Sequence, residues 1–97
     1  QEAVQLIKAG QVTPVDIREP EVYARTHIDG AVSFPAAELE SRLAELAMLT
    51  APALLYCRGG KQAEEKATLL AQKGLPVAFL EGGVLSWEAE GHRLVRP

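Results

Sequence analysis

The sequence predicts an α/β fold in three layers, in which a central and mostly parallel sheet is flanked by helices. Strand-like and helix-like segments alternate along the chain, an order typical of a sheet covered by helices on both faces. Residues 53–56 form an almost wholly apolar run, as expected for a strand that is buried on both sides of a parallel sheet. The length of 97 residues favours one domain that spans residues 1–97.

In the first third of the chain, glycine and proline set the ends of short elements. Gly10 follows an apolar-rich run and is expected to end a helix. Pro20, with Glu19 and Glu21 beside it, is typical of a first helical turn, whereas Pro14 is expected to interrupt a strand early. The expected elements are a helix at 2–9, a strand at 12–17, a helix at 20–25 and a strand at 31–34.

In the rest of the chain, the spacing of apolar residues predicts longer helices. Leucines at helical intervals predict a helix at 37–47, and Glu38 and Arg42 are placed to pair on its exposed face. Gly74 and Gly91 are expected to end the two helices that follow. The expected elements are a helix at 37–47, a strand at 53–56, a helix at 63–73, a strand at 76–80 and a helix at 84–90.

Cys57, the only cysteine, follows the apolar strand at its carboxyl end, where open α/β sheets bind their ligands. A small basic loop comes next, made of Arg58, Gly59, Gly60, Lys61 and Gln62. The backbone N–H groups of such a loop and the start of the helix behind it favour a thiolate, the reactive form of cysteine. A lone cysteine is often only a small buried apolar residue. The glycines and cations beside Cys57 favour a nucleophile instead.

The composition argues against several classes of partner and site. A formal charge of −3 disfavours nucleic acid as a main partner. One cysteine forms neither an internal disulfide nor a cysteine-based zinc site, and the two histidines lack the spacing of metal ligands. No apolar run approaches the ~18 residues of a membrane helix. We therefore expect a cytoplasmic protein without a membrane partner. Because the chain starts at Gln1, a removed signal peptide and a periplasmic location stay open.

Four stretches of the chain, in this order, resemble the signatures of the rhodanese family of sulfurtransferases. They are VDIREPEVY at 15–23, HIDGAVSFP at 27–35, LYCRGG at 55–60 and LEGGVLSW at 80–87, with Gly91 beyond. The resemblance covers nearly the whole chain and implies the rhodanese-like α/β/α fold. The sequence departs from the family at Thr26, where glycine is usual, and at Gln62, where many members carry arginine. The departure at Gln62 bears on how strongly the loop binds an anion.

The resemblance implies a two-step transfer of sulfane sulfur with Cys57 as the catalytic nucleophile. Cys57 takes sulfur from a small anionic donor such as thiosulfate, holds it as a persulfide, and passes it to cyanide or a thiol. Donor binding falls to the loop residues Arg58, Gly59, Gly60, Lys61 and Gln62. Lys61 is favoured as the cation for the donor, because Gly60 lets the loop turn back, while Arg58 is equally well explained as a surface charge. No cofactor is expected, and a partner protein in a sulfur relay is a further candidate partner.

Two other functions share parts of this pattern. Thiolate phosphatases of similar topology carry an arginine six positions after the cysteine, and Ala63 stands there instead, which disfavours phosphate binding. A persulfide carrier, or a sensing module of a larger protein, keeps the same loop, so this alternative stays open. Turnover with thiosulfate separates a carrier from an enzyme.

The other polar or aromatic residues that attract attention are predicted to be structural. Asp16 and Arg18 share one face of a strand and are expected to pair. His27 is expected to hydrogen-bond the backbone of its turn, and Trp87 to pack in the core. The two glycines at 82–83 are expected to form a tight turn that approaches the Cys57 loop.

Overall fold

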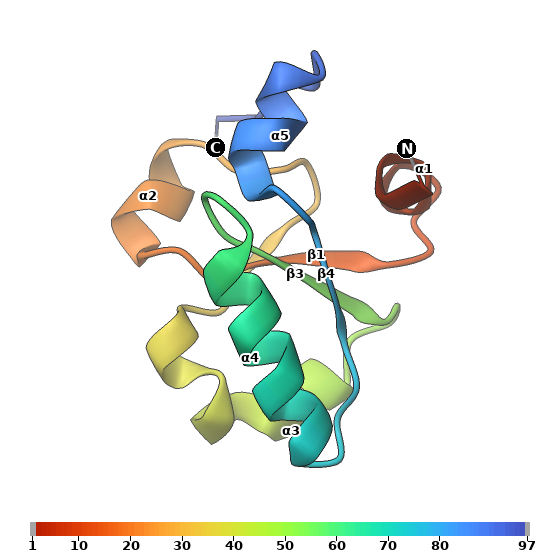
Figure 1. Ribbon diagram of the computed structural model, residues 1–97, viewed down its shortest axis with the longest axis vertical. Helices are drawn as coiled ribbons and strands as arrows, with labels where there is room; N and C mark the ends of the chain where they lie inside the picture. The colour runs from red at the N-terminus through yellow and green to blue at the C-terminus, as the bar shows by residue number, and fades with distance from the viewer. Residues whose placement is uncertain (1, 97) are drawn as a thin grey trace.

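A parallel sheet forms the centre of the computed structural model, which describes residues 2–96 (Figure 1). The strands lie in the order β2-β1-β3-β4, and every neighbouring pair is parallel. Their bounds are β1 Thr13–Asp16, β2 Val32–Ser33, β3 Ala53–Tyr56 and β4 Ala78–Phe79. The helices are α1 Glu2–Lys8, α2 Pro20–Arg25, α3 Leu43–Ala47, α4 Lys61–Gln72 and α5 Gly83–Ala89, with short 3-10 turns η1 Ala36–Glu38 and η2 Glu40–Arg42.

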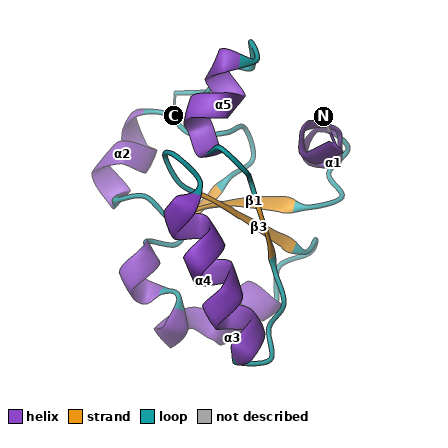
Figure 2. Ribbon diagram, in the orientation of Figure 1, coloured by secondary structure: helices purple, strands orange, loops and turns teal. Residues whose placement is uncertain are grey.

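The helices surround the strands, as Figure 2 shows, and the predicted α/β class is confirmed. One hydrophobic cluster packs Leu55 of β3 against Ala67 and Leu70 of α4. The cluster on the other face packs Tyr56 of β3 with Trp87 of α5. Successive strand residues point to opposite faces, so β3 serves both clusters. The predictions that β3 is central and buried, and that Leu70 and Trp87 are core residues, are confirmed.

Pro14 lies within β1 rather than interrupting it, which corrects the expectation from the sequence. The backbone nitrogen of Thr13 donates to the carbonyl of Pro52, beside β3, at 2.8 Å. Alternation along a strand then turns the nitrogen of Pro14 toward the β2 side. β2 begins only opposite Val15, so no strand partner needs the N–H group that proline lacks.

The helix expected at 37–47 is divided into η1, η2 and α3, which is a second correction. The backbone of Arg42, at φ −123° and ψ 29°, leaves the helical region and starts α3 anew. The predicted pair of Arg42 with Glu38 is present at 3.1 Å, and Arg42 also pairs with Glu45 at 2.9 Å. Its guanidinium covers the ring of Phe34 at 4.1 Å from the ring centroid. The remaining elements match their predicted positions with small differences at the ends. Among residues 2–96, no helix combines the length and apolar character needed to cross a membrane.

Candidate active site

Cys57 lies at the carboxyl end of β3, at the point where the loop to α4 begins. The residue is 5% exposed, and its sulfur accepts hydrogen bonds from the backbone N–H groups of Gly60 (3.1 Å) and Ala63 (3.4 Å). Both donors belong to the start of α4, where the helix dipole also favours negative charge. The local backbone is therefore arranged to stabilise an anionic sulfur.

The shape of the loop depends on glycines that let it pack closely against the start of α5. Gly60 has φ 98°, and a Cβ there would lie 2.7 Å from the backbone nitrogen of Gly82. A Cβ on Gly83 would overlap the carbonyl oxygen of Cys57. The backbone N–H of Val84 donates to that same carbonyl at 3.0 Å. The predicted approach of the glycine turn at 82–83 to the Cys57 loop is confirmed. This contact holds the backbone of Cys57 and of Gly60 in place.

Cys57 lines a cavity of about 260 Å³. Its lining consists of Ile17, Arg18, Glu19, Val22, Ala36, Cys57, Arg58 and Gln62. The expectation that Cys57 lies at a pocket is confirmed, and the residue is at the same time buried and part of the hydrophobic cluster on the α4 side of the sheet. Cys57, Arg58 and Gln62 are thus brought together, while Gly60 does not line the cavity and donates its backbone N–H to the sulfur. Gly59 and Lys61 are exposed and do not line the cavity, so the role of Lys61 in donor binding stays a prediction.

Five lining residues were not singled out as site residues from the sequence: Ile17, Arg18, Glu19, Val22 and Ala36. The first four lie in the connection after β1 and in α2, and Ala36 begins η1 after β2. β1 is the parallel neighbour of β3, so their carboxyl ends meet at one edge of the sheet. That rule, applied to the segment after the first strand, is the signal that points to the first four of them.

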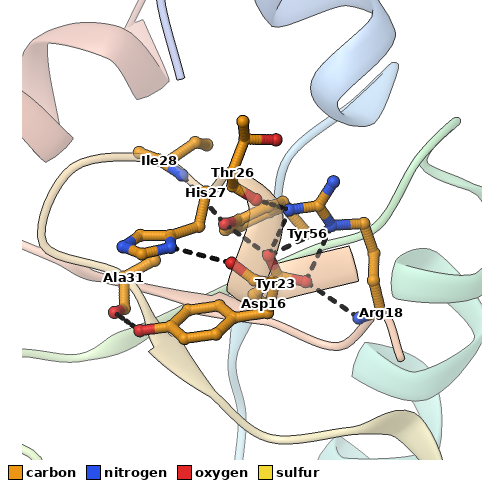
Figure 3. A network of polar contacts seen from close by, with 8 residues as sticks. All are labelled: Asp16, Arg18, Tyr23, Thr26, His27, Ile28, Ala31 and Tyr56. Atoms are coloured by element: carbon orange, nitrogen blue, oxygen red, sulfur yellow. Dashed lines mark hydrogen bonds and ion pairs between the residues drawn. The ribbon is translucent and has the colours of Figure 1, made fainter. Parts of the chain in front are cut away.

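Arg18 is held in place by the carboxylate of Asp16, which is fully buried (Figure 3). Arg18 Nη2 donates to Asp16 Oδ2 at 2.6 Å and to the carbonyl oxygen of Thr26 at 2.7 Å, and the predicted structural pair is confirmed. Burial lowers the pKa of the Arg18 guanidinium, but the hydrogen bonds and charge of Asp16 outweigh this effect and raise the pKa above its ordinary value. The charge of Arg18 is therefore permanent and largely balanced by Asp16.

Tyr56, directly before Cys57 in the chain, completes this network. Its hydroxyl donates to Asp16 Oδ2 at 2.8 Å and accepts from the backbone N–H of Ile28 at 3.1 Å. Burial, reinforced by the negative charge of Asp16, raises the pKa of the Tyr56 phenol far above its ordinary value. Tyr56 is thus a neutral donor that ties β3 to β1 below the active loop.

His27 contributes to the turn after α2 and does not line the Cys57 cavity. Its Nδ1 lies 3.0 Å from the carbonyl oxygen of Tyr23, and because a carbonyl only accepts, Nδ1 is the donor. Its ring stacks on the ring of Tyr23, with centroids 4.1 Å apart. The predicted structural role of His27 is confirmed. Within residues 2–96, no group of three or more His, Cys, Asp or Glu side chains gathers in a way that could hold a metal ion.

The fold and the loop define a class of α/β domain that presents a single cysteine at the N-terminus of a helix. The chain belongs to the rhodanese-like domain family, whose model matches residues 1–90. The resemblance stated from the four sequence signatures is therefore confirmed.

Several known proteins are similar to the chain over most of its length. The HTH-type transcriptional regulator Rv0324 of Mycobacterium tuberculosis is 40% identical over 86 residues, which cover 87% of this chain but 38% of the regulator. The thiosulfate sulfurtransferase GlpE of Coxiella burnetii is 30% identical over 89 residues, which cover 91% of this chain and 82% of GlpE. The crystal structure of a rhodanese-related protein from Thermoplasma volcanium superposes with a TM-score of 0.85 at 27% identity, covering 98% of this chain and 95% of that one.

Proposed function

We propose that the protein is a thiosulfate sulfurtransferase in which Cys57 carries the transferred sulfur as a persulfide. The Cys57 thiolate attacks the outer sulfur of thiosulfate, and a new S–S bond forms. The original S–S bond of thiosulfate breaks, and sulfite leaves with its electron pair. A thiolate or cyanide then attacks the outer sulfur of the persulfide and releases the Cys57 thiolate.

The observation that carries this proposal is the pair of N–H groups directed at the Cys57 sulfur beside an open cavity. Such preorganised donors stabilise the thiolate before attack and again after sulfur has left. Arg58 and Gln62 line the same cavity, where a guanidinium and an amide can bind the sulfonate end of the donor. The name of the C. burnetii relative supports the same reaction class.

The geometry gives no support to phosphate transfer. The residue six positions after Cys57 is Ala63, which is fully buried and offers only its backbone N–H to the sulfur. Ala63 therefore has no side-chain donors with which to bind two oxygens of a phosphate group, as an arginine at that position would.

Intact-mass measurement after thiosulfate treatment tests the proposal. We expect the protein to gain one sulfur atom and to lose it on addition of cyanide. Cys57→Ser is expected to lose both the adduct and the turnover, because serine forms no persulfide. Circular dichroism of the variant serves as the control for folding. Thiosulfate turnover that survives Cys57→Ser would exclude the mechanism.

A second candidate, a persulfide carrier or sensing module, is favoured by the 40% identity with part of a transcriptional regulator. A module of this kind retains the loop and accepts sulfur at Cys57 without rapid turnover. Steady-state kinetics with thiosulfate and cyanide distinguish the two: loading without catalytic turnover supports the module, and sustained turnover supports the enzyme.

A further inference from the structure

A second cavity, here called the α1–α5 cavity, lies between the last turn of α1 and the end of α5, both labelled in Figure 1. It is lined by residues 7–8, 28–29, 87 and 91–93. Its volume of about 490 Å³ falls within the ~300–1,000 Å³ of small-molecule sites. No residue lines both this cavity and the Cys57 cavity. The α1–α5 cavity is therefore separate from the candidate active site.

The buried part of its lining is apolar and aromatic. Ile28 is fully buried, Trp87 is 6% exposed, and Ile7 packs against the same hydrophobic cluster. The imidazole of His92 lies beside the indole of Trp87, with ring centroids 4.9 Å apart and ring planes tilted by 46°. An aromatic ring that enters here leaves water and also meets other rings, which favours a flat aromatic ligand over an aliphatic one.

Hydrogen bonds hold one wall of the α1–α5 cavity in place. Gly91, with φ 91°, turns the chain back after α5. The backbone N–H of His92 then donates to the carbonyl of Trp87 at 3.1 Å, and the indole Nε1–H of Trp87 donates to the carbonyl of Arg93 at 3.1 Å. A ligand therefore binds without first having to order this segment, which reduces the entropic cost of binding.

Two exposed cations, Lys8 and Arg93, complete the lining and outnumber its single carboxylate, Asp29. Neither cation takes part in an ion pair within the described part of the chain. Lys8 ends α1, where a cation also complements the helix dipole, but the carbonyl of Ile7 is already paired there with the N–H of Gly10 at 3.1 Å. Arg93 lies beyond the end of α5. The charge of the lining therefore favours an anionic group.

We propose that the α1–α5 cavity is a second binding site, separate from Cys57, for a small aromatic carboxylate. The aromatic ring contacts Ile28 and Trp87, and the carboxylate meets Lys8 and Arg93. Binding is reversible and involves no covalent step. It does not depend on the function proposed for Cys57.

Titration with 2-naphthoate, followed by the NMR signal of the Trp87 indole N–H, tests this inference. The chain has one tryptophan, so this signal needs no further assignment and reports on the α1–α5 cavity. We expect the signal to move saturably with a Kd of about 0.1–1 mM, as a ligand of this size allows. The neutral 2-naphthalenemethanol is expected to bind about tenfold more weakly. Decalin-2-carboxylate, which keeps the charge and lacks the aromatic rings, is expected to bind about threefold more weakly.

Three substitutions locate the probe. Lys8→Gln and Arg93→Gln each remove one exposed cation from the α1–α5 cavity, and each is expected to weaken 2-naphthoate binding by about threefold to fivefold. Arg58→Gln is the matched control, because it removes the same charge from the Cys57 cavity, and it is expected to keep the original Kd. Circular dichroism checks that all three variants fold.

Several outcomes would overturn the inference. No saturable movement of the Trp87 signal below about 10 mM 2-naphthoate excludes the site. A loss of affinity in Arg58→Gln as large as that in Arg93→Gln places the probe in the Cys57 cavity instead. Equal affinity for the three probes excludes an aromatic carboxylate as the ligand. Sulfur loading of Cys57 is measured independently, so none of these outcomes bears on the proposed sulfurtransferase.

Discussion

At the scale of single residues, the candidate active site combines a cysteine that accepts backbone hydrogen bonds with a cavity that has little unpaired positive charge. Arg18 is paired with Asp16, so Arg58 is the lining cation with no ion pair among the described residues. Gln62 lines the cavity at the position where many family members have arginine. In the proposed reaction, the side chain at position 62 would therefore change the positive charge of the cavity that receives the donor.

Gln62→Arg is expected to lower KM for thiosulfate by about threefold to tenfold, because it adds a cation and up to five N–H donors at the cavity. The gain is expected to shrink at high salt, since the new charge is partly exposed. Steady-state kinetics at two ionic strengths measure both effects. Arg58→Gln and Lys61→Gln are matched controls that remove the same charge, and only Arg58 lines the cavity. We therefore expect KM for thiosulfate to rise more in Arg58→Gln than in Lys61→Gln. A larger rise in Lys61→Gln would instead identify Lys61 as the cation that binds the donor.

Of the residues that line the cavity, the sequence pointed to Cys57, Arg58 and Gln62, which lie close together in the chain, and missed those that the sheet brings in. Cys57, its basic loop and the glycine turn at 82–83 are recognisable because each forms a local pattern. Arg18 and Val22 reach the cavity only through the pairing of β1 with β3, a contact distant in sequence. Composition and periodicity do not encode such a pairing, so these residues needed the structure.

At the scale of elements, predictions that rest on local sequence signals are correct, and one that depends on tertiary contacts is wrong. α2 and β3 match their predicted bounds, because a proline in a first helical turn and a buried apolar run are local signals. The helix expected at 37–47 is divided because Arg42 adopts a non-helical backbone while its side chain contacts Glu38, Glu45 and Phe34. Leucine spacing alone does not show that break, since Leu39, Leu43 and Leu46 all still pack in the hydrophobic core.

The start of α5 packs against the Cys57 loop, and this contact predicts the effect of adding a methyl group at Gly83, the first residue of α5. Gly83→Ala is expected to lower the free energy of unfolding by about 1–3 kcal/mol through backbone strain and by a further 1–3 kcal/mol through the clash with the Cys57 carbonyl. Displacement of the loop is expected to reduce turnover by about a hundredfold. Urea unfolding and steady-state kinetics measure the two effects.

Gly91→Ala is the matched control for this variant. Gly91 also has a positive φ, of 91°, but a Cβ there meets no atom within 4 Å. It therefore incurs the backbone strain without the clash, and full turnover is expected. If Gly83→Ala and Gly91→Ala lose the same amount of stability, the close contact between α5 and the Cys57 loop does not restrict the side chain at position 83.

At the scale of the whole molecule, the Asp16, Arg18 and Tyr56 network joins the two central strands to the turn after α2 beneath the reactive loop. Tyr56 is fully buried and belongs to the cluster that packs α1 and α5 on the sheet. Ionisation of its phenol would place a second negative charge beside Asp16. The stability of the fold is thus coupled to the protonation of this one hydroxyl.

This coupling predicts how stability changes in alkali. The folded-state pKa of Tyr56 is raised above the value of about 10 for an unfolded tyrosine. Above pH 10 the unfolded chain therefore releases a proton that the folded chain keeps, and the free energy of unfolding falls as pH rises. One such group contributes a slope of up to about 1.4 kcal/mol per pH unit. Below pH 10 its full contribution to stability is present.

Tyr56→Phe removes this slope along with two hydrogen bonds. At neutral pH the variant is expected to be less stable than the original protein by roughly 1–3 kcal/mol, because Asp16 and the Ile28 N–H lose a partner. Between pH 10 and 11 the difference is expected to narrow, because the original protein loses stability through Tyr56 as pH rises and the phenylalanine variant does not. Urea unfolding at several pH values from 8 to 11 gives both quantities, and all other titrating groups are common to the two proteins. A constant difference across this range would mean that the Tyr56 phenol ionises in the folded state as readily as in the unfolded chain.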